Sequence, residues 1–144
     1  MFNWMRKKRP AEDAEFNHSC LGKLNWNKKD NEWIGDRKGI IISLGHEDNL
    51  VEPSQELLGY ATEMLADTKL ESILEQEKSK LIREVGELTP QQQSEIQELY
   101  FESINFSLYK GDGYIFVVLG PENDERSWRL EVFDNQNSAL GFDT

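Results

Sequence analysis

The sequence predicts an α+β fold, in which an antiparallel sheet of six or seven strands carries two to three helices packed on one face. Apolar side chains recur at every second position over residues 21–44, which is typical of strands. They recur at helical spacing over residues 57–85, and the two-residue period returns from residue 103. A chain of 144 residues with this pattern is expected to form one domain.

The first three predicted strands form an antiparallel meander. Residues 21–27 alternate leucine and tryptophan with other residues, and the polar stretch 28–31 is typical of a turn. A second strand is expected to begin at residues 32–35. The isoleucines within residues 39–44 indicate a third strand.

Two helices are predicted after this meander, over residues 53–66 and 69–86. Thr68 and Glu71 have the spacing of a capping box, which favours a new helix start at that point. Gly86 is expected to cap the end of the second helix, because glycine tolerates the left-handed backbone of a helix terminus.

A third, short helix is predicted from Thr89 to about Leu99. Thr89 is followed by Pro90, which suits a first helical position, and by Gln92 at the distance of a capping box.

The remainder of the chain is predicted to be sheet. Residues 103–110 alternate, and residues 111–113 are typical of a hairpin turn. Residues 114–119 are almost continuously apolar, which predicts a central strand covered on both faces. Residues 127–133 alternate again, and residues 139–142 are expected to form a last short strand.

The core is expected to combine apolar side chains from the predicted strands with apolar side chains from the predicted helices. Its predicted members are Trp26, Trp33, Ile41, Leu57, Met64, Leu74, Leu81, Phe106, Phe116, Val118, Trp128 and Leu130.

Residues 1–18 are predicted to be a flexible tail, followed by a single α+β domain over residues 19–144. The first five residues are largely apolar and include Phe2 and Trp4, and the run from Arg6 to Arg9 is entirely basic. This chemistry suits at most a weak contact with an anionic membrane surface. The alternatives are a tail that folds back onto the domain and one that stays free.

The charge of the chain favours a basic protein partner. The formal net charge is -11, and once the four basic residues 6–9 are set aside the rest carries 12 basic and 27 acidic residues. Such a body repels nucleic acid phosphates and attracts basic proteins, faster at low salt. The alternative is that the acidic residues serve solubility alone.

The expected compartment is the cytoplasm. Cys20 is the single cysteine, which excludes an internal disulfide and fits a reducing environment. No stretch approaches the roughly 20 apolar residues that span a bilayer. The N-terminal basic residues are not followed by the apolar segment of a secretory signal.

The sequence contains no pattern typical of catalysis or of cofactor binding. Nucleophile elbows, phosphate-binding loops and zinc-protease motifs are missing from it. His18, Cys20 and His46 lack the number and spacing that predict a metal site. The chain is therefore predicted not to be an enzyme and to need no cofactor. A small-molecule-binding protein or an enzyme remains the third hypothesis.

Five acidic side chains at turns of the C-terminal sheet are the predicted contacts with a basic partner, because turns present side chains from a rigid scaffold. Ordinary turn chemistry is the alternative explanation for them. These residues are Asp112, Glu122, Asp124, Glu125 and Asp134.

Five different short motifs are spread along the chain: Leu21-Gly-x-Leu24 with Trp26, Trp33-x-Gly35, Leu88-Thr-Pro90, Ser103-Ile-Asn-Phe106 and Ser127-Trp128. Together they resemble a small bacterial family that is catalogued as a domain of unknown function. The resemblance covers about residues 1–144, including the short aromatic and basic tail with which members begin. Some relatives look like immunity proteins of polymorphic toxin systems.

The leading functional hypothesis is a non-enzymatic acidic binding protein, and the resemblance implies an immunity-type inhibitor of a basic toxin. In that mechanism the acidic surface replaces the phosphates that the toxin binds, or fills its cleft. The alternative is a cytoplasmic accessory or scaffold protein of bacterial origin without a toxin partner.

Overall fold

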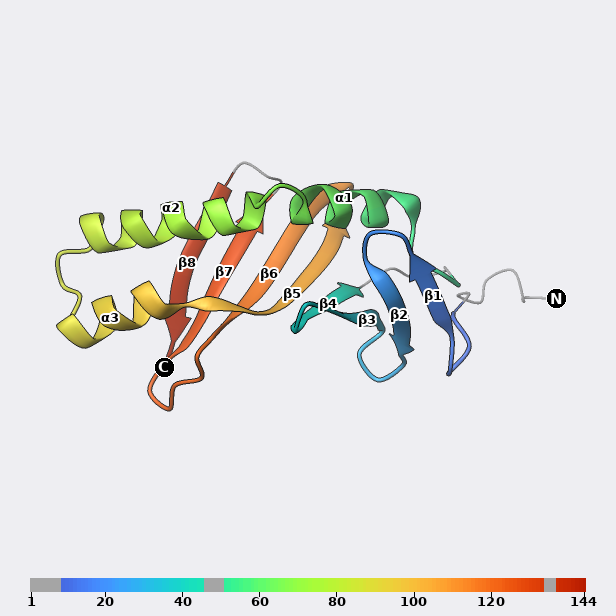
Figure 1. Ribbon diagram of the computed structural model, residues 1–144, viewed down its shortest axis with the longest axis horizontal. Helices are drawn as coiled ribbons and strands as arrows, with labels where there is room; N and C mark the ends of the chain where they lie inside the picture. The colour runs from blue at the N-terminus through green and yellow to red at the C-terminus, as the bar shows by residue number, and fades with distance from the viewer. Residues whose placement is uncertain (1–8, 46–50, 134–136) are drawn as a thin grey trace.

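The computed structural model describes residues 9–45, 51–133 and 137–144, which form one sheet and three helices (Figure 1). This confirms the predicted α+β class, with eight strands instead of six or seven. The strands are β1 (Glu15–His18), β2 (Gly22–Asn27), β3 (Glu32–Arg37), β4 (Ile40–Gly45), β5 (Tyr100–Tyr109), β6 (Asp112–Gly120), β7 (Ser127–Phe133) and β8 (Asn137–Asp143). The helices are α1 (Gln55–Leu65), α2 (Lys69–Glu84) and α3 (Pro90–Glu98).

The order of strands in the sheet follows their order in the chain, from β1 to β8. Neighbouring strands are antiparallel except for β4 and β5, which run parallel. A parallel pair needs a long crossover, and the three helices lie in the connection between these two strands. The sheet is therefore two antiparallel meanders, β1–β4 and β5–β8, joined at one parallel seam.

β1 is the strand that the sequence did not predict. Phe16 pairs with Leu24 of β2, and its ring packs edge to face on Trp33 with 6.3 Å between ring centroids. The strand lies inside residues 1–18, the range predicted as tail, so the chain joins the sheet before residue 19. A four-residue strand with one large apolar side chain is too short to show an alternating pattern in the sequence. Its extended conformation depends on pairing with β2.

Two helix starts follow their local sequence signals. At α3, the Thr89 hydroxyl accepts from the Gln92 N–H at 3.1 Å, and the Gln92 side chain accepts from the Thr89 N–H at 2.9 Å. This reciprocal pair confirms the predicted capping box. At α1, the Ser54 hydroxyl caps the helix by accepting from the Leu57 N–H at 3.1 Å.

The start and the end of α2 differ from prediction. Thr68 has left-handed backbone, with φ 57°, and its side chain makes no capping bond. A capping side chain requires extended backbone, so the predicted capping box at Thr68 is wrong. At the other end the cap is Val85, whose extended backbone brings its N–H to the Leu81 carbonyl at 3.1 Å, so Gly86 is not the cap.

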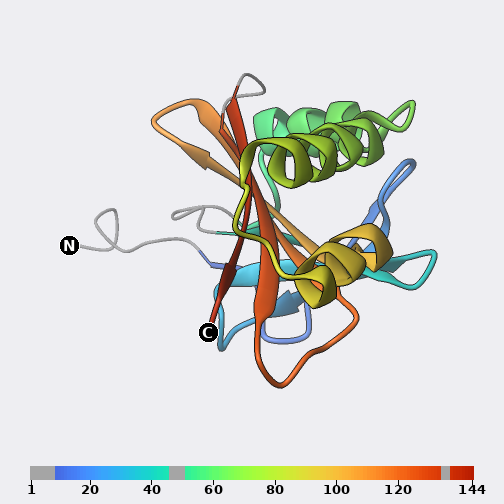
Figure 2. The same cartoon turned by 90° about the vertical axis from the view of Figure 1, so that its left-hand side faces the viewer.

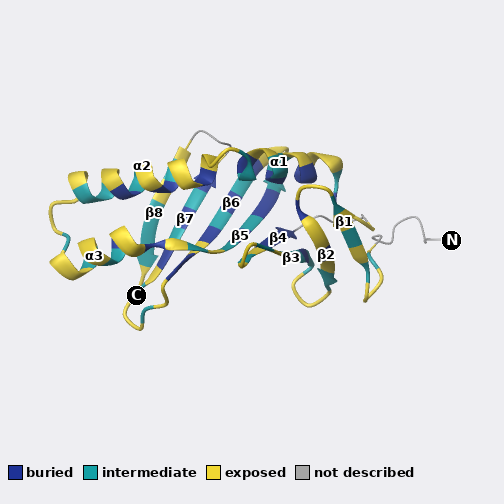
Figure 3. Cartoon of the chain, viewed as in Figure 1, coloured by how far each residue is buried: buried dark blue, intermediate teal, exposed yellow. Residues whose placement is uncertain are grey.

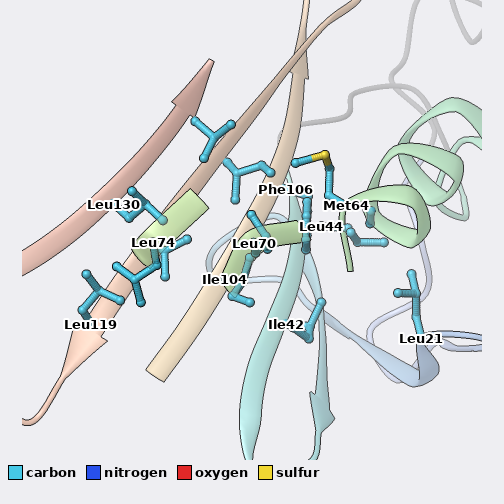
Figure 4. Close-up of a cluster of buried hydrophobic side chains, with 14 of the residues drawn as sticks. Leu21, Ile42, Leu44, Met64, Leu70, Leu74, Ile104, Phe106, Leu119 and Leu130 are labelled. Atoms are coloured by element: carbon cyan, nitrogen blue, oxygen red, sulfur yellow. The ribbon is translucent and has the colours of Figure 1, made fainter. Parts of the chain in front are cut away.

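All three helices lie on one side of the sheet (Figure 2). The buried residues gather in the layer between the helices and the sheet, where Leu70 and Leu74 of α2 meet Ile104 and Leu130 of the strands (Figures 3 and 4). Seven of the predicted core residues are buried as expected: Trp33, Leu57, Met64, Leu74, Phe106, Trp128 and Leu130.

Two predicted core residues are exposed, and three are half-buried. Ile41 is 50% exposed and Val118 is 38% exposed, so both predictions are wrong. Their neighbours Ile42 and Val117 are buried instead. The reason is that the helices cover one face of the sheet, so every second residue of an apolar run points away from them. The half-buried members of the predicted core are Trp26, Leu81 and Phe116.

Candidate protein-interaction surface

The face of the sheet opposite the helices, termed the open face, is the main candidate for a functional surface. Its side chains follow from the strand register. Ser103, Asn105 and Ser107 of β5 stand beside Val118, Phe116 and Tyr114 of β6. Those three β6 residues in turn stand beside Arg129, Glu131 and Phe133 of β7. Within the described part of the chain, no helix lies over these side chains (Figure 2).

An apolar cluster occupies the centre of the open face. Tyr114, Phe116 and Val118 follow one another along β6, and Phe133 of β7 stacks on Tyr114 with 5.2 Å between ring centroids. Phe133 is 43% exposed. These four residues are termed the aromatic patch. A contiguous apolar surface of this kind is typical of interaction sites.

A hollow of about 480 Å³ opens at one end of the aromatic patch, where β5 turns into β6. Its volume lies in the range of sites that hold a small ligand or a buried side chain of a partner. Asp112, one of the predicted contacts, forms part of its wall. The lining residues are Ser107, Leu108, Tyr109, Asp112, Gly113, Tyr114 and Phe133.

Charged side chains flank the aromatic patch on its β7 side. The Arg129 guanidinium lies 3.1 Å from a Glu131 oxygen and 2.8 Å from an Asp143 oxygen. Burial raises the pKa of the Tyr114 phenol above 10.0, and the negative charge and hydrogen bond of Glu131 raise it further, while Arg129 lowers it. Tyr114 is therefore neutral at physiological pH.

A polar cluster lies on the same face beside the seam. The Asn105 amide donates to the Ser43 hydroxyl at 2.7 Å and to the Glu32 carboxylate at 3.2 Å. These residues come from β5, β4 and β3. Polar and acidic side chains of the open face therefore extend across the seam onto the N-terminal meander.

The loop between β6 and β7 carries three of the five predicted contacts, Glu122, Asp124 and Glu125, and all three are exposed. Arg126 anchors the loop to α3 by donating to Glu95 at 2.7 and 3.1 Å. The two side chains of that pair are 11% and 15% exposed.

Two further interactions hold this loop in place. The Asn123 amide donates to the Glu95 carboxylate and accepts from the Glu125 N–H. The hydrogen bond to Glu95 raises the pKa of Arg126, so the guanidinium stays charged. The loop therefore presents its acidic side chains from a fixed backbone.

The structure separates the four predicted contacts that it describes into two groups. Asp112 begins β6, whereas Glu122, Asp124 and Glu125 follow its end, about 26 Å away along a strand of this length. Asp134 lies outside the described residues. The aromatic patch lies between these two groups, and two of its members, Phe116 and Val118, were predicted to be core residues. The alternation of Arg129 and Glu131 on the neighbouring strand was the signal that this face meets water.

Of the three residues considered as metal ligands, the structure describes His18 and Cys20. The His18 imidazole accepts from the N–H groups of Cys20 and Leu21 at 3.1 and 3.2 Å, which fixes the turn after β1. His46 lies outside the described residues. Among those that the structure describes, no three His, Cys, Asp or Glu side chains gather as a metal site would require.

Comparison of the chain with protein-family models, with curated proteins and with solved structures gives no match. The three helices of the described ranges are too short or too polar to cross a membrane. The function is therefore inferred from the geometry and charge of the open face.

Proposed function

We propose that the protein is a non-enzymatic binding protein whose open face receives a basic protein partner. The aromatic patch is the observation that supports this most directly, because it exposes apolar side chains from two adjacent strands together. Protein interfaces commonly combine such an apolar centre, rich in aromatic residues, with a polar rim. The hollow beside Tyr114 and Phe133 offers a place for an anchoring side chain of the partner.

The charge around the patch supports a basic partner. On the open face carboxylates outnumber basic side chains by five to two. The carboxylates are those of Glu15, Glu32, Asp36, Glu131 and Asp143, and the basic side chains are those of Lys23 and Arg129. The whole chain adds a long-range negative field, with a net charge of -11. Such a field accelerates the encounter with a positively charged surface at low salt.

The most concrete form of the proposal is an immunity-type inhibitor of a basic toxin. The aromatic patch would cover an apolar part of the toxin surface, and the surrounding carboxylates would replace the phosphates that the toxin binds. An accessory or scaffold protein is the alternative, in which the same face binds a basic protein that is not a toxin.

The test is affinity capture from the source cell with the full chain and two matched variants. Val118→Lys places a charge on the open face, and Val85→Lys places the same charge just after α2. The two valines are 38% and 40% exposed, so neither substitution disturbs the core. We expect a basic protein to be retained by the wild type and by Val85→Lys, and lost from Val118→Lys. Equal capture by both variants, or capture of acidic proteins alone, contradicts the proposal.

A further inference from the structure

We propose that the outer edge of β8 binds an extended segment of another protein, which joins the sheet as an added strand. β8 is the last strand in the order of the sheet, and among the described strands only β7 pairs with it. Backbone N–H and C=O groups on its outer side therefore lack a neighbouring strand, and such a row pairs readily with an extended chain. This edge and the open face are different surfaces, so the inference does not rest on the proposed function.

The two edges of the sheet differ in the features that prevent pairing. β1, at the opposite edge, has only four residues, and its Glu15 carboxylate lies 3.1 Å from the Lys23 ammonium group of β2. β8 has seven residues, among them neither proline nor lysine, and Asp143 at its end is its single charged residue. All seven pair with β7 in continuous register, without a bulge. Short length, lysine, proline and bulges protect sheet edges, so β8 is the less protected of the two edges.

A hollow of about 190 Å³ lies along the edge of β8. On the strand it contacts Ser138, Ala139 and Leu140 in succession. Ser138 and Leu140 point towards the helices, because they pair with Val132 and Leu130, whereas Ala139 points to the open face. A space that contacts residues of both orientations reaches the backbone at the edge of the strand. Its volume is below the roughly 300 Å³ at which small-molecule sites begin, and it suits one side chain of a bound segment.

The second wall of the hollow is the end of α2. The residues that form it lie on one stripe of the helix and at its C-cap, at spacings of three and four: Glu77, Lys80, Leu81, Glu84 and Val85. Leu81 is half-buried and Val85 is 40% exposed, so apolar surface remains uncovered beside the strand. Figure 1 shows that the end of α2 and α3 lie beyond β8, so the helical layer is wider than the sheet on this side. An added strand fills the space under this overhang.

The overhang also argues against a second copy of this chain as the occupant. Two copies that pair antiparallel through β8 are related by a two-fold axis perpendicular to the sheet. Both helical layers then lie on the same side of the joined sheet, and the overhanging parts of α2 and α3 collide with those of the other copy. An extended segment without a helical layer of its own fits beside β8.

The apolar part of the edge defines every second residue of the segment. Side chains of the segment that point towards the helices meet Leu140, Leu81 and Val85, and apolar residues suit these positions. Side chains that point the other way lie beside Ala139 and Gly141, which are small and leave room for long side chains.

The charge at the edge defines the remaining residues. The hollow, β7 and β8 together carry four carboxylates and two basic side chains. The Asp143 carboxylate is 72% exposed, and the Arg129 guanidinium is already bonded to it and to Glu131. Lysine or arginine in the segment complements this excess of carboxylates. The segment is therefore one in which apolar and basic residues alternate. The carboxylates are those of Glu77, Glu84, Glu131 and Asp143, and the basic side chains are those of Lys80 and Arg129.

The test uses a peptide of the same length as β8 in which valine alternates with lysine. Hydrogen–deuterium exchange of the full chain is followed by NMR. In the free protein the outward N–H groups of β8, at every second residue, face solvent and exchange rapidly. A peptide at about ten times its Kd should slow their exchange about tenfold, because exchange then requires the unbound fraction. The amides of β1, at the protected edge, should exchange as before.

One peptide control and two variants locate the binding. The same peptide with every backbone nitrogen methylated keeps its charge but cannot donate to a strand, and it should leave the exchange unchanged. Val85→Lys should restore the free exchange rate at the same peptide concentration, because it places a like charge beside the peptide. Gln76→Lys, at an exposed position of α2 outside the hollow, is the matched control and should bind the peptide as the wild type does.

Three outcomes would overturn the inference. The first is unchanged exchange in β8 at millimolar peptide, and the second is equal slowing by the methylated peptide, which would show attraction by charge alone. The third is slow exchange of β8 without peptide that increases with protein concentration, which would show that a second copy holds the edge. Partner capture is lost in Val118→Lys and retained in Val85→Lys if the proposed function is right, so each proposal can fail without the other.

Discussion

Lys78 is a buried charged residue that connects α2 to the end of α3. Its ammonium group is buried and donates to the Leu99 carbonyl at 3.1 Å, to the Gln97 carbonyl at 3.5 Å and to Glu75 at 3.2 Å. The two carbonyls belong to the end of α3, where the last backbone acceptors of a helix have no helical partner. Lys78 thus attaches α3 to α2 by satisfying those acceptors.

Replacing Lys78 by methionine keeps most of the aliphatic stem and removes the donor. We expect the free energy of unfolding to fall by about 1–3 kcal/mol, the cost of leaving buried acceptors unpaired. Urea denaturation measures it. Lys80→Met, at an exposed position of the same helix, is the control and should stay within about 0.5 kcal/mol of the wild type. Equal losses in the two variants would mean that Lys78 acts through its stem alone.

Tyr114 offers a second test at the residue scale. Its pKa is raised by burial and then by Glu131, so Glu131→Gln should bring the pKa closer to 10.0 without removing the effect of burial. The neutral phenol is favoured by folding. Its contribution to stability is therefore present below pH 10 and is lost as the pH rises through the raised pKa. Carbon NMR of the tyrosine rings during a pH titration follows the change. Glu63→Gln on α1 is the control, and an unchanged pKa in Glu131→Gln would exclude the contact.

At the scale of elements, two adjacent isoleucines of β4 point to opposite faces of the sheet. Ile42 is 1% exposed and faces the helices, whereas Ile41 is 50% exposed on the other face. Ile42→Ala should cost about 2–5 kcal/mol of stability, because it leaves a cavity in the core.

Ile41→Ala is the matched control for that experiment. It should cost no more than about 1 kcal/mol, the range of strand propensity. Thermal or urea unfolding of the two variants gives the comparison. Similar costs would mean that something covers the open face at Ile41.

The loop between β6 and β7 is a second, separate contact to test. Because Arg126 and Glu95 fix its backbone, reversing Glu122 and Asp124 to lysine changes the charge of the loop and keeps the Glu125 carboxylate that lies 3.2 Å from Arg126. We expect slower association with a basic partner and a weaker dependence on salt. Reversal of Glu56 and Glu71, both exposed on the helices, is the control with the same change in net charge. An unchanged association rate for the loop variant would exclude the loop from the interface.

The elements that were predicted correctly are those whose structure depends on their own residues and not on a distant part of the chain. The capping box at Thr89 needs only Thr89 and Gln92, and it forms as expected. Thr68 has the same sequence spacing and fails, because a left-handed backbone at the junction of α1 and α2 removes the geometry. β1 was missed because its four residues become a strand through pairing with β2.

At the scale of the whole molecule, the sequence indicated the layers but not which strands had both faces covered. The apolar run of β6 was interpreted as a strand buried on both sides, and Val118 shows that one side is exposed. Coverage depends on where the helices lie after the crossover, which no single strand encodes. The candidate surface was missed for this reason, and the acidic residues at turns were predicted as contacts in its place.

The parallel seam is formed by strands that are far apart in the sequence, whereas the pairs within each meander are formed by strands that follow one another. Every hairpin of the two meanders joins strands that are close in sequence, so each can pair early at a small cost in chain entropy. β4 and β5 meet only after the long connection that holds all three helices has been closed, and such distant pairing is slow. We therefore expect each meander to behave as a cooperative unit of its own. The joining of Ile42 to Ile104 across the seam is then the late step that makes one molecule of two halves.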